Sequence, residues 1–358
     1  MTRYRLEKLQ AVGKLPAKPL VIKTQVTTEL ITAITTAFGG VVNGDLLVGF
    51  KYIGNILGEL EAHGRFGDVT ASLDDFVLGT EESHGLLLTP HIRDKDAAGA
   101  AVVLAEMASD LASEGRTIYD YLIETYKRYG YFRNYLRSTI MAGAAGTAAI
   151  QKIQAELRAN PPTEIGGRKV EQVVDYFDEE RFGPFVSNTD RAGRNLMTYF
   201  LEGGLKATIR PSGTEPKNKI YLEMPSEPLG PCASDAEFLA QKALVDAGVV
   251  EFSNAFLETM LEIVGISLPA FCLEVSDLVS LENKMHFGKE FAPRLLEKAR
   301  MVDSGSATEE SVQQWIDDSL KSYGSDARLL VSRAFDAFVA QQADEPGVAT
   351  AVRVFRAQ

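Results

Sequence analysis

The chain has 358 residues, of which 45% are hydrophobic and 24% charged, an ordinary balance for a globular protein of two or three domains. It has no apolar run long enough to span a membrane, no apolar signal-peptide core, and only two cysteines, too few for a disulfide framework. The net charge of −12 is concentrated in residues 226–358, with 21 acidic against 11 basic residues, which argues against a nucleic-acid partner. We expect a cytoplasmic protein that binds neither membrane nor nucleic acid.

The first 130 residues predict an α/β domain with a largely parallel sheet, because strand and helix patterns alternate at the spacing of such domains. Strands are expected at residues 19–23, 41–48 and 76–78, and helices at residues 1–12, 28–38, 52–63 and 96–113. Ligands of open α/β sheets gather at the carboxyl ends of the strands. The loops that follow these strands are therefore candidates for a site.

The pattern changes near residue 131, and residues 131–225 predict a smaller α+β domain with an antiparallel sheet. A helix is expected at residues 143–159, and strands at residues 134–140, 170–177, 195–201, 205–209 and 219–224. After Pro225, apolar residues recur at spacings of three and four, which indicates that residues 226–358 are mostly helical. These apolar stripes are interpreted as core packing.

The most distinctive local string is a basic turn between two predicted strands, Arg210-Pro211-Ser212-Gly213-Thr214-Glu215-Pro216-Lys217. Two prolines stiffen it, and Gly213 frees one backbone position. Hydroxyls, turn amides and a guanidinium fork are the groups that bind a phosphate dianion. On the residues alone, a solvated surface turn without a ligand is an equally good interpretation, because basic turns are common.

A second string, Gly79-Thr80-Glu81-Glu82-Ser83-His84-Gly85, follows a short apolar strand. Glu81 and Ser83 lie two positions apart, so in an extended loop they would face the same way. A carboxylate and a hydroxyl on one face suit vicinal sugar hydroxyls. The alternative is a polar loop whose side chains cap the next element.

Two lysines occupy charged turns that precede predicted helices. Lys51 lies in Gly49-Phe50-Lys51-Tyr52, where its charge opposes the helix dipole unless an anion is near. Lys95 lies between Asp94 and Asp96, where it could also be a neutralised cap. Each lysine has two interpretations: it binds an anionic ligand, or it is a solvated surface charge, as charged turns usually are.

These four loops, in this order, resemble the alpha-D-phosphohexomutase superfamily, which includes phosphoglucomutases and phosphomannomutases. The resemblance runs from about Pro19 to Met224, and its most specific strings are residues 210–217 and the Gly-x-Glu-Glu-Ser loop. It implies a Rossmann-like third domain at residues 1–130, a TBP-like fourth domain at residues 131–225 and a helical extension at residues 226–358.

The resemblance also implies roles for particular residues. By residue-for-residue correspondence, Glu81 and Ser83 would contact sugar hydroxyls, and Lys51 and Lys95 would line the cleft. The phosphate would be bound by the residues Arg210, Ser212, Gly213 and Thr214, with Lys217 nearby. Family members move a phosphoryl group between the C1 and C6 hydroxyls of a hexose phosphate through a sugar bisphosphate, which also serves as activator.

The sequence departs from the family in one respect. It contains neither a Thr-Ala-Ser-His-Asn-Pro-like serine loop nor an Asp-x-Asp-x-Asp-Arg loop for Mg²⁺, and Thr189-Asp190-Arg191 is a poor remnant of the latter. Phosphoryl transfer depends on a positioned nucleophile and on charge neutralisation by the metal. We therefore expect the C-terminal part of a mutase, inactive alone, with a separately encoded N-terminal half as a candidate partner.

Two other functions stay open at the level of sequence. The chain could be a non-catalytic protein that binds or senses a phosphosugar. It could also be an interaction module that acts through residues 226–358, although an intact phosphate loop argues against that. The sequence does not choose among glucose, mannose and pentose phosphates.

Overall fold

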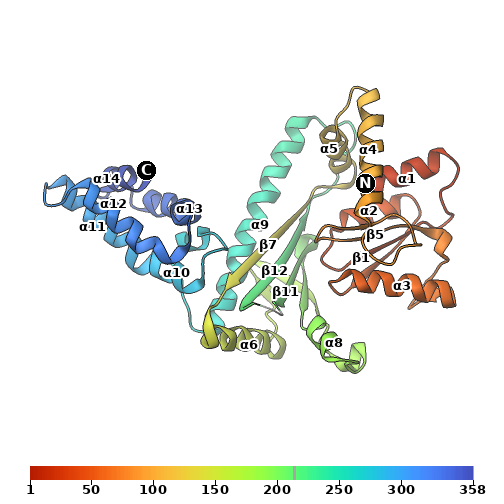
Figure 1. Cartoon of the computed structure of the whole chain (residues 1–358), viewed down its shortest axis with the longest axis horizontal. Coiled ribbons are helices and arrows are strands. Elements are labelled where there is room, and N and C mark those ends of the chain that lie inside the picture. Colours follow the sequence, from red (N-terminus) through yellow and green to blue (C-terminus); the bar gives the residue numbers. More distant parts are fainter. Residues whose placement is uncertain (213–214, 358) are drawn as a thin grey trace. The chain divides into compact units, whose positions relative to one another are not determined.

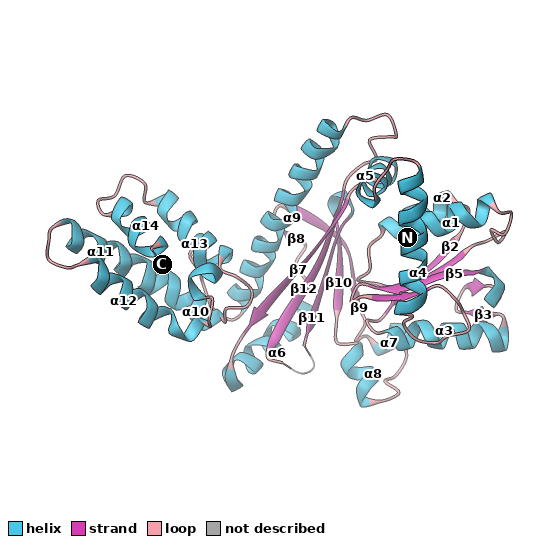
Figure 2. Cartoon of the chain, turned by 45° about the horizontal axis from the view of Figure 1, so that its top comes forward, coloured by secondary structure: helices cyan, strands magenta, loops and turns pink. Residues whose placement is uncertain are grey.

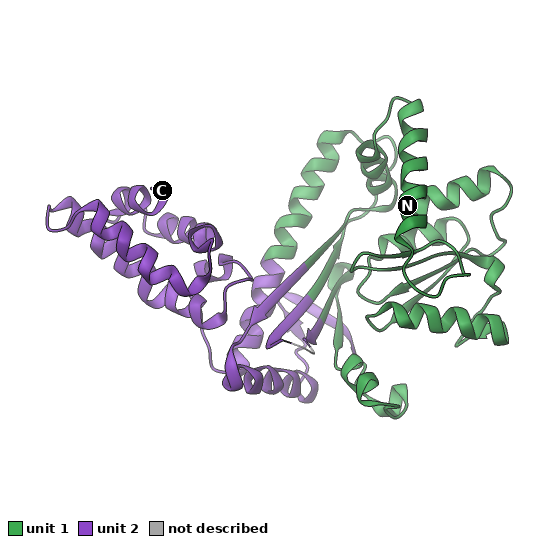
Figure 3. Ribbon diagram, in the orientation of Figure 1, with its two compact units in different colours: residues 1–135, 176–208, 221–250 green, residues 136–175, 209–220, 251–358 purple. Residues whose placement is uncertain are grey.

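The computed structural model describes residues 1–212 and 215–357. The chain divides into two compact units that interleave along the sequence (Figure 3). Unit 1 comprises residues 1–135, 176–208 and 221–250, and unit 2 comprises residues 136–175, 209–220 and 251–358. These units do not follow the boundaries expected at residues 130 and 225, so the division into three consecutive domains stays a prediction.

A four-stranded sheet in the order β2-β1-β5-β6 organises the first part of unit 1 (Figures 1 and 2). Its strands are β1 (Leu20–Thr24), β2 (Val41–Leu46), β5 (Phe76–Glu81) and β6 (Gly85–Leu87). β1 pairs in parallel with β2 and with β5, whereas β5 pairs antiparallel with β6. The expected α/β organisation with a largely parallel sheet is confirmed, and the small ribbon of β3 (Arg65–Phe66) and β4 (Val69–Thr70) accompanies it.

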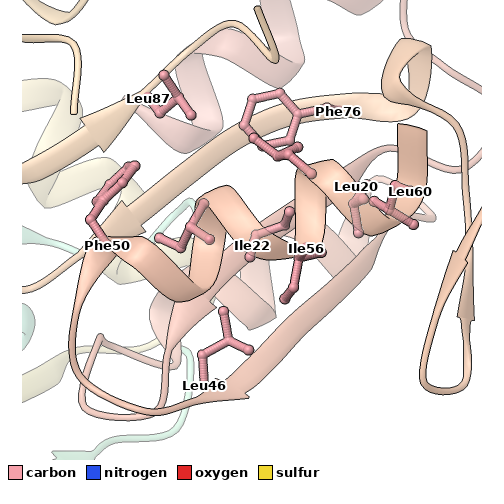
Figure 4. Close-up of a cluster of buried hydrophobic side chains, with 10 residues drawn as sticks. Leu20, Ile22, Leu46, Phe50, Ile56, Leu60, Phe76 and Leu87 are labelled. Atoms are coloured by element: carbon pink, nitrogen blue, oxygen red, sulfur yellow. The ribbon is translucent and has the colours of Figure 1, made fainter. Parts of the chain in front are cut away.

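Successive residues of β1 alternate between the two faces of this sheet, as the pleat of a strand requires. Leu20 and Ile22 join the core beneath helix α3 (Phe50–His63), shown in Figure 4, while Val21 joins the core on the other face. That second core packs against α1 (Thr2–Ala11) and α2 (Leu30–Ala37). Helices therefore cover both faces of the sheet, which leaves its carboxyl edge as the place for polar loops.

Two further helices complete this part of unit 1. α4 (Ala97–Ser113) starts where expected, and Asp96 caps it by accepting from Gly99 N at 2.9 Å. α5 (Ile118–Tyr129) has no counterpart in the sequence prediction. Its start carries a capping box in which Thr117 and Asp120 each accept the other's backbone N–H, a signal that the sequence contains.

A second sheet has six strands in the order β7-β12-β11-β10-β9-β8. The strands are β7 (Phe132–Ile140), β8 (Glu164–Ile165), β9 (Arg168–Asp175), β10 (Met197–Leu201), β11 (Leu205–Pro211) and β12 (Lys217–Pro225). β8 and β9 pair antiparallel. Three helices accompany the sheet: α6 (Gly143–Ala159), α7 (Glu179–Phe182) and α8 (Asn188–Gly193).

The chain beyond β12 is helical, as expected. Its helices are α9 (Asp235–Ile263), α10 (Leu281–His286), α11 (Ala292–Asp303), α12 (Glu309–Leu320), α13 (Ala327–Gln341) and α14 (Val348–Arg356). Most of the stripe residues are buried, among them Phe256, Ile316 and Phe335, which supports their interpretation as core. No helix within the described ranges is both long enough and apolar enough to cross a membrane.

Candidate functional site

The loop that carries Glu81 and Ser83 is a tight hairpin rather than the extended loop assumed from the sequence. β5 continues to Glu81, which pairs with Gly85 across the hairpin, and residues 82–84 form the turn. Thr80 Oγ1 donates to Gly85 O at 2.8 Å, which closes the turn. Because Glu81 is in the strand and Ser83 is in the turn, spacing by two does not by itself make their side chains face the same way.

Gly85 is required by the close approach of its neighbours. A β-carbon at this position would collide with Cγ of Glu81 and lie 2.9 Å from Cδ2 of Phe50. The Glu81 side chain therefore crosses over its partner strand toward the Phe50 ring at the start of α3. Sequence reasoning noticed the loop but missed the roles of Gly85 and Phe50.

Lys95 is brought to the same place by the segment between β6 and α4. Asp96 N donates to Leu86 O at 2.8 Å, which ties the segment to β6. Lys95 Nζ lies 5.2 Å from the centroid of the Phe50 ring and pairs with Asp94 at 3.0 Å. Lys95 thus lies beside the hairpin that carries Glu81. It also pairs with Asp94, as expected if its charge is neutralised at the start of the helix.

Burial is the main influence on the Glu81 carboxyl and raises its pKa. The positive charge of Lys95 opposes this rise, while Glu82 and Asp94 add to it. Among the described residues, no side chain or backbone group donates a hydrogen bond to the carboxylate of Glu81. A half-buried carboxylate with free acceptor positions can accept hydrogen bonds from the hydroxyl groups of a ligand.

Lys51 is exposed in the first turn of α3, and its Nζ lies 4.9 Å from the centroid of the neighbouring Tyr52 ring. In the described structure no contact joins it to Glu81 or Lys95. Ser83 is exposed at the tip of the hairpin, where its Oγ donates to Glu82 Oε1 at 3.2 Å. The structure brings Glu81 and Lys95 together and leaves Lys51 and Ser83 at the surface.

The position of this hairpin in the sheet is significant. From β1 the chain continues to β2 on one side, whereas β5 lies on the other side of β1, so the order of strands reverses there. Open α/β sheets bind ligands outside the carboxyl ends of strands at such a switch point. Glu81 ends β5 at this edge, and residues 25–29 follow β1 beside it.

Residues after β1 form a polar cluster that sequence reasoning missed. Glu29 pairs with Lys23 at 2.9 Å and with Lys206 at 2.7 Å, and its backbone N–H donates to Glu223. Burial alone would raise the pKa of Glu29, but the charges of Lys206 and Lys23 hold it at about 2. No local pattern indicates this cluster, because Lys206 and Glu223 lie 177 and 194 residues further along the chain.

The phosphate-loop string forms the hairpin between β11 and β12 in unit 2. Ser212 N donates to Lys217 O at 2.8 Å, which closes the neck of the hairpin, and Lys217 pairs with Glu215 at 2.9 Å. The Nε of Arg210 is buried without a hydrogen-bond partner among the described residues. Gly213 and Thr214, both predicted to bind phosphate, lie outside the described residues.

A metal site finds no support in the residues that the structure describes. Within residues 1–212 and 215–357, no three His, Cys, Asp or Glu side chains group closely enough to hold an ion. The described residues thus offer no ligand set for the Mg²⁺ that the resemblance implies, and no chemical step is assigned to a metal in this chain.

The first part of the chain matches a known family of domains. The family described as phosphoglucomutase/phosphomannomutase, alpha/beta/alpha domain III, matches residues 2–129. A phosphoglucomutase of Staphylococcus aureus strain MRSA252 is 32% identical over 208 residues, which are 57% of this chain and 36% of that protein. The enzyme of strain N315 is 31% identical over the same lengths. The chain thus spans about a third of the length of these curated relatives.

Among solved structures, the open form of the phosphoglucomutase parafusin from Paramecium is similar over 75% of this chain and 43% of the parafusin chain. The sequence identity is 15% and the TM-score 0.45, values too low to indicate a shared function.

Proposed function

We propose that this chain, which belongs to the alpha-D-phosphohexomutase superfamily, binds a hexose 1- or 6-phosphate through its two polar hairpins. The sugar hydroxyls are contacted from the β5–β6 hairpin by Glu81 and Ser83, with Lys95 and Lys51 at its border. The phosphate is bound by the β11–β12 hairpin, through Arg210, Ser212, Gly213, Thr214 and Lys217. The Rossmann-like and TBP-like domains at residues 1–130 and 131–225, and a cytoplasmic location, are parts of the same proposal.

The observation that carries the proposal is the state of Glu81. Its carboxylate is half-buried at the switch point of a parallel sheet, beside Lys95, and accepts no hydrogen bond from the described residues. A half-buried carboxylate that accepts nothing from the protein has its acceptor positions free for a ligand or water. Sugar hydroxyls are donors of the required kind, and Lys95 can donate to the same sugar.

The composition of the second hairpin supports phosphate as the other half of the ligand. Arg210 keeps a buried Nε without a partner among the described residues, so its guanidinium has donors left for an anion. Ser212 and Lys217 flank the neck that the Ser212 N to Lys217 O hydrogen bond closes. Charge-assisted hydrogen bonds from such groups are about twice as strong as neutral ones.

A titration of the isotope-labelled chain with glucose 1-phosphate, followed by NMR, tests this function. We expect saturable shifts with a dissociation constant in the millimolar range, about −4 kcal/mol. Arg210→Ala should weaken binding by ~1.5–3 kcal/mol, because it removes a charge-assisted partner. Lys169→Ala, at an exposed position of β9, removes one positive charge as a control and should leave binding unchanged. Equal binding by Arg210→Ala would show that the phosphate site is wrongly assigned.

The proposal for the reaction is intramolecular transfer of a phosphoryl group between C1 and C6, with this chain supplying recognition only. The 358 residues contain no phosphoserine loop and no Mg²⁺ loop of the superfamily type, so turnover requires both loops from outside these residues; a separately encoded N-terminal half is one proposed source. The alternative is a non-catalytic phosphosugar-binding or regulatory protein.

An activity assay separates these two functions. The purified chain should show no phosphoglucomutase or phosphomannomutase turnover with Mg²⁺ and a sugar bisphosphate. Co-expression with the N-terminal half of a superfamily member should restore turnover if the chain is a recognition module of a mutase. If the chain alone shows turnover and Arg210→Ala abolishes it, the proposal that this chain supplies recognition only is wrong.

A further inference from the structure

The C-terminal helical region, residues 251–357, contacts the end of β7, and the residues just after β7 contact the β11–β12 hairpin, which is called the phosphate hairpin below. These contacts all lie within unit 2 (Figure 3). Ser138 N in β7 donates to Asp277 Oδ2 at 2.8 Å, and Ala142 N, just after β7, donates to Glu282 Oε1 at 3.1 Å. Two acidic side chains of the helical region thus satisfy backbone groups at one end of this strand.

Between these two anchored positions, the chain contacts the phosphate hairpin itself. Met141 N donates to Pro216 O at 2.9 Å. Pro216 directly precedes Lys217, whose carbonyl accepts the Ser212 N–H and closes the neck of the hairpin. A displacement of residues 138–142 would therefore move one side of that neck.

Buried charges fix this contact. Arg137 on β7, with a 3% exposed side chain, lies 3.4 Å from Asp277, and Lys284 of α10, 2% exposed, lies 3.5 Å from the same carboxylate. Arg137 also donates to Leu273 O at 2.6 Å, and Lys284 to Val275 O at 2.9 Å. Because buried charges are costly unless paired, this arrangement allows few positions for the segment that carries Asp277.

A second, independent contact reaches the other side of Lys217. Asn218 is 1% exposed, and its Nδ2 lies 3.5 Å from Sδ of Met260 on α9, while its Oδ1 accepts from Gln154 Nε2 at 3.3 Å. The residue after Lys217 is therefore held by the same helical region that holds residues 138–142. Pro216 and Asn218, the two neighbours of Lys217, are both restrained.

We propose that the C-terminal helical region positions the phosphate hairpin, with Glu282 and Asp277 as positioning residues that act through residues 138–142 and Pro216. The proposal rests on the function proposed above, since it assigns a role to the same hairpin. It gives residues 251–357 a task in ligand binding although none of them needs to touch the ligand. Preorganisation of this kind raises affinity by lowering the ordering cost on binding.

The test uses the full chain and three variants that change one side chain each. Glu282→Ala removes the acceptor for Ala142 N, and Glu282→Gln retains an acceptor oxygen. Glu310→Ala removes the same negative charge from an exposed position of α12 and serves as the matched control. The readouts are the amide signals of Ser212 and Lys217 in the free protein, and the affinity for glucose 1-phosphate.

We expect Glu282→Ala to shift the Ser212 and Lys217 signals, which Glu282 does not touch, and to weaken binding ~fivefold, the effect of one lost hydrogen bond. Glu282→Gln should restore both readouts, and Glu310→Ala should change neither. Signals and affinity identical to wild type in a folded Glu282→Ala protein would overturn the proposal. Should that variant not fold, Met260→Leu, which keeps the volume of the side chain but loses the sulfur acceptor, gives the same readouts.

The two proposals fail in different ways. If wild type shows no saturable shifts with glucose 1-phosphate, the proposed function is wrong, and the amide signals alone decide the positioning role. If wild type binds and Glu282→Ala binds equally with unshifted signals, the function stands and the positioning role is wrong.

Discussion

The two polar hairpins of this chain are built in different ways. The β5–β6 hairpin takes its geometry from residues close in sequence: Phe50, Gly85 and Lys95 belong to one α/β arrangement. The β11–β12 hairpin is held through Met141 and Asn218 by the C-terminal helical region, residues 251–357. The first hairpin should therefore tolerate changes in residues 251–357, and the second should not.

The largest effect is expected from Asp277→Ala. This change leaves Arg137 and Lys284 buried without their shared carboxylate, and breaking one partner of a buried ion pair costs about 3–5 kcal/mol. Urea unfolding measures the loss. Asp277→Ala combined with Lys284→Met, which removes one of the two cations, should recover part of it. Amide signals of the β5–β6 hairpin should stay in place, and their displacement would contradict the independence of the two hairpins.

Lys284 should contribute stability to the helical region that increases with pH in the alkaline range. Burial lowers the pKa of Lys284 to about 8, against the attraction of Asp277, with Arg137 and Cys272 as its other charged or titratable neighbours. Between pH 8 and the unfolded pKa of about 10.4, the unfolded chain holds a Lys284 proton that the folded chain has lost, so the contribution of Lys284 to the unfolding free energy increases by on the order of 3 kcal/mol. Below pH 8 both states are protonated and this dependence disappears. The thiol of Cys272, whose pKa burial raises to about 12, has the opposite effect above its unfolded pKa.

Lys284→Met should abolish that increase, because methionine fills the site without a titratable group. The comparison between wild type and variant removes the contribution of other lysines and of the cysteines. Parallel curves of unfolding free energy against pH for the two proteins would show that Lys284 is not the group responsible.

A methyl group at Gly85 should damage the β5–β6 hairpin selectively. The added β-carbon of Gly85→Ala collides with Glu81 and crowds Phe50, which should cost ~1–3 kcal/mol as overpacking and lower the affinity for the sugar. Gly58→Ala, inside α3 with open space around it, should instead stabilise by ~0.5–1 kcal/mol. Thermal unfolding and the glucose 1-phosphate titration measure the two effects. Full binding by Gly85→Ala would contradict the proposed role of Glu81.

The smallest effect at neutral pH is the titration of Glu81. Burial raises its pKa, with Lys95 opposing, so the carboxylate gains its proton at a higher pH than an ordinary glutamate as the solution is acidified. Sugar binding should decline over that range, because a protonated carboxyl loses acceptor strength. A pH series of titrations on wild type and on Glu81→Gln measures it, and an equal pH dependence in both would exclude Glu81 as the cause.

The order of helices and strands was largely predictable from the sequence, whereas the conformation and contacts of the site residues were not. The elements containing Val21, Ile53 and Ile153 have simple periodicities, so their type and approximate extent followed from the pattern. α5 was missed although its capping box is visible at Thr117 and its buried face, Tyr121, Thr125 and Tyr129, recurs every four residues. The loop at Glu81 was placed correctly but given the wrong conformation, because hairpin pairing with Gly85 depends on the neighbouring strand.

Local sequence patterns were enough to predict the α/β order of the first 130 residues and the helical C-terminal third, and they contain the two strings that resemble phosphohexomutase loops. These follow from local periodicity and from residue types that stand close together in the chain. Only the tertiary structure placed Lys95 beside Glu81 and joined Glu29 to Lys206. It alone linked Asp277 and Glu282 to the strand end beside the phosphate hairpin. Most of these contacts join residues far apart in the chain, and all are decided by packing and by the pairing of charges, which no short window of sequence contains.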